Sequence, residues 1–222
     1  MPQFKAFSWS SLSGFETCPK QHYHLRIAKD WPDQKGEAAL WGDTVHKAIE
    51  ARMKHGTALP VWGKGIEPLI QKLQAAKGVS LQVEHKVAIN ANLQPTDYFA
   101  RDVWCRSIAD VNAVAPKAMM TLDWKTGKFK ENIDQLRLSA AVNFCHYPHI
   151  ERFTIQYAWL KEGRTTTRTF LREEVPAIWS DFMPRVKRMQ IAYEKNEFPA
   201  KPSGLCRQHC PILSCEHNGR RK

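Results

Sequence analysis

The sequence contains no run of 18 or more apolar residues, the length that a helix needs to cross a bilayer. Its first residues, MPQFKAFSWSSLSGFE, do not combine a charged start with a long apolar stretch, as a secretory signal does. Fixed-period repeats and low-complexity tracts are also absent, which excludes solenoids and propellers. Six cysteines are far too few for a disulfide-stapled domain of this length. We therefore expect a soluble cytoplasmic protein with reduced thiols and no membrane partner, in the host cytoplasm if a phage encodes it.

The composition is that of a globular protein with a basic surface. The chain has 222 residues, of which 43% are hydrophobic and 25% are charged, enough for one core or two small ones. Lys and Arg number 33 and Asp and Glu number 22, so the formal net charge is +11. A charge of this sign favours a polyanionic partner such as nucleic acid.

The apolar pattern predicts helices first and a sheet afterwards. Helical spacing is expected over 8–27 (as one or two short helices), 37–55, 66–77, 132–146 and 179–193. Strand patterns cover 83–89, 104–114, 118–125, 152–160 and 165–171, the last two joined by a hairpin at Glu162-Gly163. This order predicts an α/β fold in which helices flank a mixed central sheet. A helical N-terminal segment and a cysteine-bearing C-terminal tail complete the predicted architecture.

A short motif near mid-chain carries the strongest chemical signal. Asp123 and Lys125 are separated by one residue on a predicted strand, so their side chains leave the same face of the sheet. Asp110 would approach Asp123 if the two strands that carry them pair. Adjacent carboxylates repel each other, and a divalent cation such as Mg²⁺ or Mn²⁺ relieves that repulsion. A lysine beside such a cation is suited to hold a water molecule while the metal polarises a phosphodiester.

Six segments occur in a fixed order along the chain. They are SWSSLSGFETCPKQHYHL, WGDTVHKAIE, VEHKVAI, RSIADV, LDWKTGK and QLRLSAAV. Together they resemble the PD-(D/E)XK nucleases of the RecB and Cas4-like group, whose pattern runs from Ser-x-Ser and Cys-Pro through Gly-x-x-x-His and Gly-x-x-Asp to Asp-x-Lys-Thr-Gly and Gln-x-x-x-Tyr. The pattern falls on Ser8, Ser10, Cys18-Pro19, Gly42, His46, Ser107, Asp110, Asp123 to Gly127 and Gln135.

The resemblance covers most of the chain and implies a restriction-endonuclease-like core. It implies a single nuclease domain over 1–222, with a helical part over 1–80, a catalytic core over 81–198 and a cysteine-rich tail over 199–222 that closes onto Cys18. Two positions depart from the family pattern. Ser107 stands where the family usually has Gly, and Ser139 replaces the usual Tyr of the Gln motif.

The resemblance also implies roles for individual residues. His46, Asp110 and Asp123 would bind Mg²⁺ or Mn²⁺, together with the backbone carbonyl of Trp124. Lys125 would be the catalytic lysine, and Gln135 matches the supporting motif that follows the active site.

Three of the polar residues have a structural alternative. His46 lies at the border of a helical apolar stripe and is compatible with a backbone partner there. Asn132 and Gln135 have the spacing of a capping box at a helix start. Glu84 fits equally well as an acidic residue near the metal or as a solvent-facing side chain.

The tail contains Cys206, Cys210 and Cys215 within ten residues, a spacing typical of metal ligands in an intracellular protein. In the related nucleases a distant Cys-Pro motif supplies the fourth cysteine, which here is Cys18. The resemblance thus implies a [4Fe-4S] cluster that joins the two ends of the chain. The family spacing C-x2-C-x5-C is C-x3-C-x4-C here, and His209 and His217 lie close by, so a zinc site is the alternative. Cys105 and Cys145 are expected in the core.

The excess of basic residues predicts salt-sensitive binding to phosphates. The candidate DNA contacts are Lys128, Lys130, Arg185 and Arg188. Trp41, Trp159 and Trp179 follow apolar patterns and are expected in the core, so they would not stack on bases.

The sequence therefore predicts a metal-dependent deoxyribonuclease. An exonuclease acting on single-stranded DNA or DNA ends, in recombination, repair or phage DNA metabolism, is favoured. The alternatives are a nuclease-like module that binds DNA or protein with little cleavage, and a Cas4-type nuclease of CRISPR adaptation.

Overall fold

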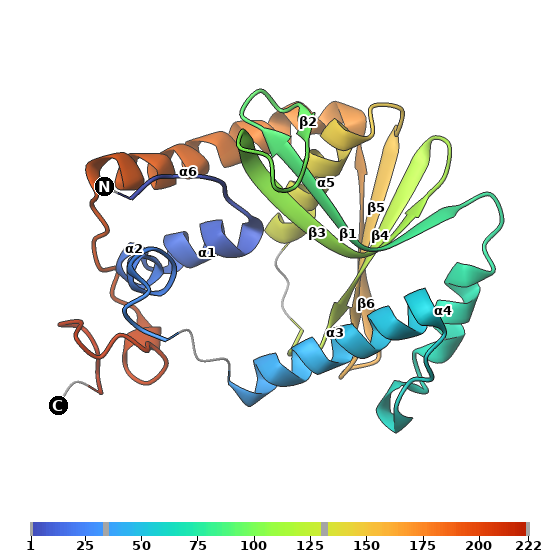
Figure 1. The fold of residues 1–222 in the computed structure, drawn as a ribbon, viewed down its shortest axis with the longest axis horizontal. Coiled ribbons are helices and arrows are strands. Elements are labelled where there is room, and N and C mark those ends of the chain that lie inside the picture. Colours follow the sequence, from blue (N-terminus) through green and yellow to red (C-terminus); the bar gives the residue numbers. More distant parts are fainter. Residues whose placement is uncertain (1, 33–35, 130–132, 221–222) are drawn as a thin grey trace. The chain divides into compact units, whose positions relative to one another are not determined.

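The computed structural model describes residues 2–32, 36–129 and 133–220. The chain forms two compact units, one from residues 35–179 and one from residues 1–34 with 180–222. We call them the sheet unit and the terminal unit and describe each by itself (Figure 1). None of the described helices combines the length and the apolar character needed to cross a membrane.

The sheet unit is built on one six-stranded sheet with the order β2-β1-β3-β4-β5-β6. β4 and β5 are parallel and the other neighbours are antiparallel, so the sheet is mixed. The strands are β1 (Ser80–Asn90), β2 (Pro95–Thr96), β3 (Val103–Val114), β4 (Ala118–Lys125), β5 (Arg152–Trp159) and β6 (Arg164–Leu171). The expected α/β fold with a mixed central sheet is thus confirmed.

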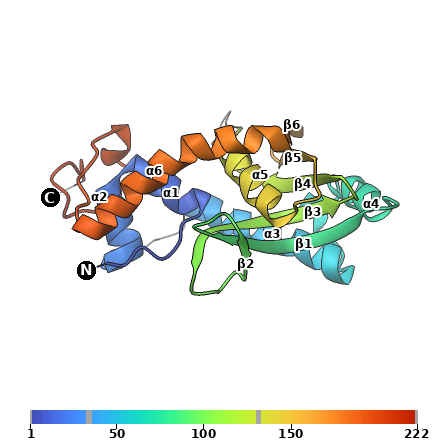
Figure 2. The same cartoon turned by 90° about the horizontal axis from the view of Figure 1, so that it is seen from above.

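Helices cover both faces of this sheet, and Figure 2 shows α3 and α5 on opposite sides of it. α3 (Glu37–His55) and α4 (Glu67–Gln74) pack their apolar stripes on one face, around Val111 and Leu122 of the sheet. α5 (Asp134–His146) lies on the other face, where Phe144 meets Phe153 edge to face at 5.8 Å. Gly56 ends α3 with a φ of 71°, a left-handed conformation that favours glycine. Because α3 is packed on the sheet, its polar residues lie close to the strands.

The terminal unit joins the two ends of the chain. It contains α1 (Trp9–Thr17), α2 (Pro19–His22), the π-helical turn η1 (Tyr23–Ala28), most of α6 (Val175–Lys195) and the 3₁₀ turn η4 (Gly204–Cys206). Ser8 caps α1 through a capping box with Ser11, as the serine-rich start predicts. Buried apolar side chains of α1 and α6 form its core, namely Leu12, Phe15, Phe182, Val186 and Met189.

Three local features differ from the sequence prediction. The two-residue strand β2 was not expected, because it is too short to show a period. α5 begins at Asp134, after Ile133, and Asn132 lies outside the described residues. Trp41 was expected in the core but is 45% exposed, whereas Trp159 and Trp179 are buried as predicted.

Candidate active site

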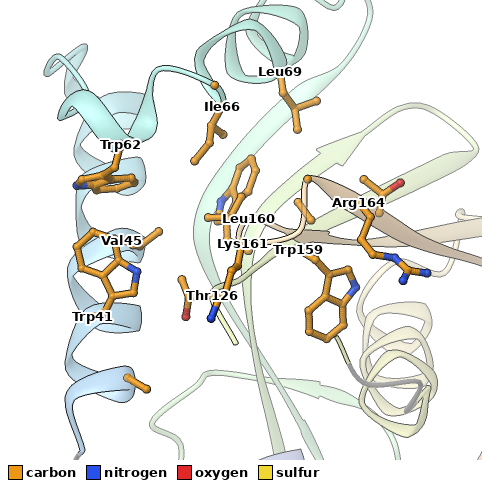
Figure 3. A pocket seen from close by; sticks show the side chains of 16 residues that line it. Trp41, Val45, Trp62, Ile66, Leu69, Thr126, Trp159, Leu160, Lys161 and Arg164 are labelled. Atoms are coloured by element: carbon orange, nitrogen blue, oxygen red, sulfur yellow. The ribbon is translucent and has the colours of Figure 1, made fainter. Parts of the chain in front are cut away.

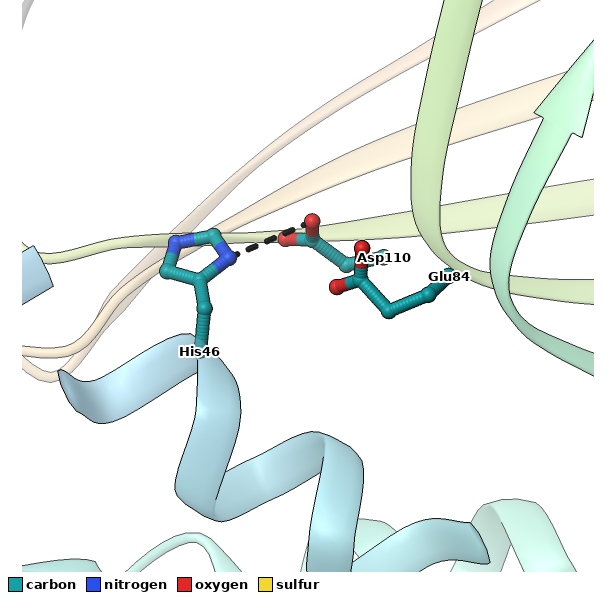
Figure 4. Close-up of side chains that lie close together, drawn as sticks. All are labelled: His46, Glu84 and Asp110. Atoms are coloured by element: carbon teal, nitrogen blue, oxygen red, sulfur yellow. Dashed lines mark ion pairs between the residues drawn. The ribbon is translucent and has the colours of Figure 1, made fainter. Parts of the chain in front are cut away.

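An interruption in the pairing of β1 and β3 forms one wall of the candidate site. Val83 pairs with Val111 and His85 pairs with Ala109, and between these pairs Glu84 adopts a φ of 52°. A positive φ is uncommon for a residue other than glycine and costs of order 1–3 kcal/mol. The distortion lies where the side chains of Glu84 and Asp110 approach His46 of α3 (Figure 4).

These three side chains form a cluster with the composition of a cation site. One ligand atom from each of His46, Glu84 and Asp110 lies within 4.8 Å of the other two. His46 Nδ1 lies 3.3 Å from Asp110 Oδ1, and this contact raises the pKa of His46. Burial raises the pKa of Glu84, and the charges of Asp110 and Glu50 raise it further. The cluster therefore holds more negative charge than its surroundings balance, a condition that a divalent cation relieves.

Asp110 is fixed in place by the neighbouring strand. Its Oδ2 accepts a hydrogen bond of 2.8 Å from the backbone N–H of Trp124. The paired part of β3 and β4 reaches Val111 and Leu122, so this side-chain bond takes over beyond the last paired residues. The peptide between Asp123 and Trp124 thus links the acidic cluster directly to the Asp-x-Lys segment.

Asp123 lies on the same strand end, and its side chain is 16% exposed. Its Oδ1 is 2.8 Å from Lys125 Nζ but makes no hydrogen bond of acceptable geometry within the described part of the chain. Burial, helped by the charge of Asp110, raises the pKa of Asp123 to about 6 against the opposing charge of Lys125. The ion pair with Lys125 offsets only part of the cost of burying this carboxylate, and a divalent cation would offset more of it.

Lys125 is oriented by two further residues. Its Nζ donates to Gln135 Oε1 at 3.3 Å, while Gln135 Nε2 donates to Asp123 Oδ2 at 3.4 Å. The amide of Gln135 therefore bridges the acid and the lysine from the first turn of α5. The ammonium also lies 4.4 Å from the ring centre of Tyr157, a cation–π contact.

Tyr157 is a residue that the sequence interpretation missed. It pairs with Asp123 across the parallel strands β4 and β5, and its buried hydroxyl has no hydrogen-bond partner among the described residues. Burial raises its pKa, and the charge of Asp123 adds to the effect. Only knowledge of the parallel pairing would have placed it here, because β5 carries no motif of its own.

The remaining candidate site residues lie elsewhere. Lys128 is exposed shortly after β4, and Lys130 lies outside the described residues. Arg185, in the terminal unit, donates two hydrogen bonds of 2.8 and 2.7 Å to Glu16, so its guanidinium has a structural partner. Arg188 is more exposed and lies 4.0 Å from the same carboxylate. Ser139 accepts a hydrogen bond from Asn143 on the next turn of α5.

The terminal unit contains a separate cluster of thiols. Cys18, Cys206, Cys210 and Cys215 line one small cavity, together with His217. Burial raises the pKa of Cys210, and the thiols of Cys206, Cys18 and Cys215 contribute. Of the other two cysteines, Cys105 is buried in the sheet unit and Cys145 is partly buried.

Backbone groups support the geometry of this thiol cluster. Cys18 Sγ and Cys206 Sγ accept hydrogen bonds from the N–H groups of Lys201 and Ser203, at 3.5 and 3.4 Å. The buried Asn218, which the sequence interpretation missed, donates to two carbonyls of the segment that carries Cys210. No motif signals it, because an isolated asparagine in a loop has many ordinary uses.

Comparison with known protein families finds no match, and no curated protein matches the chain. The fold does match solved structures. A crystal structure of a proposed exonuclease from Eubacterium rectale superposes with a TM-score of 0.55 at 14% identity, covering 92% of this chain and 87% of that chain. A second protein, SSO0001, is 10% identical over 98% of this chain and 89% of its own, but its TM-score of 0.46 is too low to support an argument. The chain therefore shares its α/β fold with the proposed exonuclease.

Proposed function

We propose that the protein is a metal-dependent deoxyribonuclease that hydrolyses phosphodiester bonds. The observation that carries this proposal is the convergence of His46, Glu84 and Asp110 beside the Asp123–Lys125 segment. The fold shared with the proposed exonuclease of Eubacterium rectale is consistent with it.

The donor set fits a hard divalent cation. Three carboxylates and one imidazole suit Mg²⁺ or Mn²⁺, and the imidazole shifts the preference toward Mn²⁺. His46, Glu84 and Asp110, which the structure brings together, would hold the ion. Asp123 and the Trp124 carbonyl are the further donors that the family resemblance implies. When bound, such an ion polarises the phosphodiester and lowers the pKa of a water molecule.

The residues of the chain have separate roles in this reaction. The Lys125 ammonium orients the attacking water and stabilises negative charge that develops on the phosphate oxygens. Gln135 and Tyr157 keep that ammonium beside Asp123, and the Trp124 N–H keeps Asp110 directed at the site. Lys128 and other exposed basic residues neutralise the phosphate backbone of the bound DNA strand.

We favour an exonuclease acting on single strands or on DNA ends. The net charge of +11 supports binding to a polyanion without sequence readout. Roles in recombination, repair or phage DNA metabolism follow from the family resemblance alone.

The four thiols of the terminal unit are proposed to hold a [4Fe-4S] cluster. Cys18, Cys206, Cys210 and Cys215 line one small cavity, which supports a shared ligand role. The choice of iron-sulfur over zinc rests on the family resemblance, in which a distant Cys-Pro motif and three C-terminal cysteines hold the cluster. Visible absorption and metal analysis of anaerobically purified protein test this proposal, and stoichiometric zinc without iron would contradict it.

The nuclease proposal is tested with end-labelled DNA. Protein supplied with Mn²⁺ or Mg²⁺ should shorten single-stranded DNA, and Asp123→Asn or Lys125→Ala should lower the rate by at least about 100-fold. Asp97→Asn, an exposed acid remote from the motif, is the matched control. Glu84→Gln should raise the concentration of Mg²⁺ needed for half-maximal rate by about 10-fold or more. Undiminished cleavage by both Asp123→Asn and Lys125→Ala would overturn the site assignment, and DNA binding without any cleavage would favour a binding module.

A further inference from the structure

A large apolar pocket adjoins the candidate active site within the sheet unit (Figure 3). Its volume is about 750 Å³. The first half of α3, the segment from η2 (Val61–Gly63) into α4, and the adjoining ends of β4, β5 and β6 enclose it. Its lining includes Trp41, Val45, Trp62, Ile66, Trp124 and Trp159.

Two indole rings form one side of this pocket. Trp41 and Trp62 meet edge to face with ring centres 5.3 Å apart and an interplanar angle of 70°. Trp41 nevertheless remains 45% exposed, although apolar residues at its helical spacing, such as Val45, are buried. An exposed indole held by a second ring offers a rigid face on which a planar group can stack.

The pocket adjoins the metal-ligand cluster at the end of β4. The Trp124 ring lines the pocket, while the N–H of the same residue holds Asp110. Thr126, which also lines the pocket, directly follows Lys125. Along α3, Trp41 and His46 are five residues apart, about 7.5 Å along the helix axis and about 140° around it. A strand whose phosphate lies at the cluster therefore has its neighbouring bases within reach of the two indoles.

The charges around the pocket suit a nucleic acid strand. Its sixteen lining residues, all described, include Lys161 and Arg164 and no acid. Arg164 lies on the rim with its guanidinium 3.9 Å from the ring centre of Phe129. An apolar interior with a cationic rim complements a strand that presents bases inward and phosphates outward.

We propose that this pocket binds unpaired nucleobases of single-stranded DNA next to the phosphate at the metal-ligand cluster. The inference rests on the proposed nuclease function and specifies its substrate, because bases within a duplex are already stacked and cannot enter. The pocket thus gives the enzyme a preference for single strands and for frayed ends.

The test is a binding experiment without cleavage, in EDTA. The probes are a fluorescein-labelled oligodeoxynucleotide, a blunt duplex of the same sequence, and an oligomer of abasic deoxyribose phosphates. Trp41→Ala should weaken binding of the single strand by roughly 5- to 150-fold, which corresponds to 1–3 kcal/mol for one stacked base. Trp41→Phe should retain most of the affinity. Leu40→Ala removes a neighbouring residue of the same helix that is 54% exposed and should change the affinity less than about two-fold.

The abasic oligomer separates stacking from phosphate binding. Wild-type protein should bind it as weakly as Trp41→Ala binds the normal strand, and the substitution should add little further loss. The inference would be overturned if Trp41→Ala weakened binding of the normal and abasic strands equally, or weakened neither. It would also be overturned if Trp41→Ala weakened binding of the duplex as much as binding of the single strand. Because the assay needs no catalysis, its outcome is independent of the Asp123→Asn cleavage test. A base-dependent loss in Trp41→Ala would stand even if no cleavage were found.

Discussion

Replacing Asp123 by asparagine should stabilise the metal-free protein at neutral pH while it abolishes cleavage. The Asp123 carboxylate is mostly buried, lies near Asp110 and is paired with the Lys125 ammonium at 2.8 Å. Burial raises its pKa from about 3.8 to about 6, against the opposing charge of Lys125. The ionised form therefore costs free energy in the folded protein that it does not cost in the unfolded chain.

The direction and the magnitude of the effect on folding stability follow from this pKa. Between pH 3.8 and pH 6 the folded protein binds the proton more tightly than the unfolded chain, so stability falls as the pH rises through this window. A pKa difference of about 2 corresponds to about 3 kcal/mol. Above pH 6 the cost is fully present, and below pH 3.8 it is absent. The stability of the Asp123→Asn variant relative to wild type should therefore rise by about 3 kcal/mol between pH 3.5 and pH 7.5.

Urea unfolding in EDTA, followed by tryptophan fluorescence, measures this difference. Six of the eight tryptophans belong to the sheet unit, so the signal reports mainly on the unit that contains the site. Asp97→Asn is again the control and should follow the wild-type curve. Mg²⁺ at 100 times its dissociation constant should stabilise wild type by about 2.7 kcal/mol. The same concentration of Mg²⁺ should stabilise the Asp123→Asn variant much less. A stability difference that stays constant with pH would refute the electrostatic reasoning.

Three further predictions concern packing and pH. Burial lowers the pKa of His22 to about 4, so the stability of wild type relative to His22→Gln should fall by about 3 kcal/mol as the pH falls from 6.5 to 4. Thermal unfolding of both proteins measures this difference, and a difference that stays constant with pH would contradict the assignment. A Cβ at Gly219 would lie 2.8 Å from a backbone oxygen, so Gly219→Ala should lower both the Tm and the amount of iron that the protein binds. Gly204 has open space around it, so Gly204→Ala should change neither quantity. A Cβ at Gly42 would lie 3.1 Å from a threonine hydroxyl, and a larger side chain would push α3 and His46 away from the sheet. Gly42→Val should therefore lower kcat/KM more than Gly42→Ala does.

The sequence predicts the fold well where a segment has a clear period. The 37–55 pattern matches α3, and the hairpin signal at Glu162-Gly163 matches the β5–β6 pair. Both depend on local rules, namely an apolar stripe that ends at a glycine and two strands around a tight turn. β2 escapes such rules because two residues cannot establish an alternation.

The site is less predictable because its parts depend on pairing between distant segments. Strand alternation alone leaves Glu84 equally suited to solvent and to the metal, and the pairing of β1 with β3 places it opposite Asp110 and near His46. Tyr157 becomes a neighbour of Asp123 through a parallel register that no local pattern specifies. Trp41 follows the apolar stripe of its helix, yet the stripe passes from a packed core into an open pocket.

Three departures from the usual rules of folding occur together in the sheet unit. Glu84 holds a strained backbone, Asp123 keeps a mostly buried carboxylate whose pKa stays raised despite its ion pair with Lys125, and Trp41 exposes an indole. Each costs free energy in the ligand-free protein, and such costs persist when function requires them. A divalent cation bound by Glu84 and Asp123 would compensate for the first two, and a stacked base would cover the third. Trp124 borders both places. Cation and single strand should therefore each stabilise the sheet unit, and because one residue links their sites, the presence of one should tighten binding of the other.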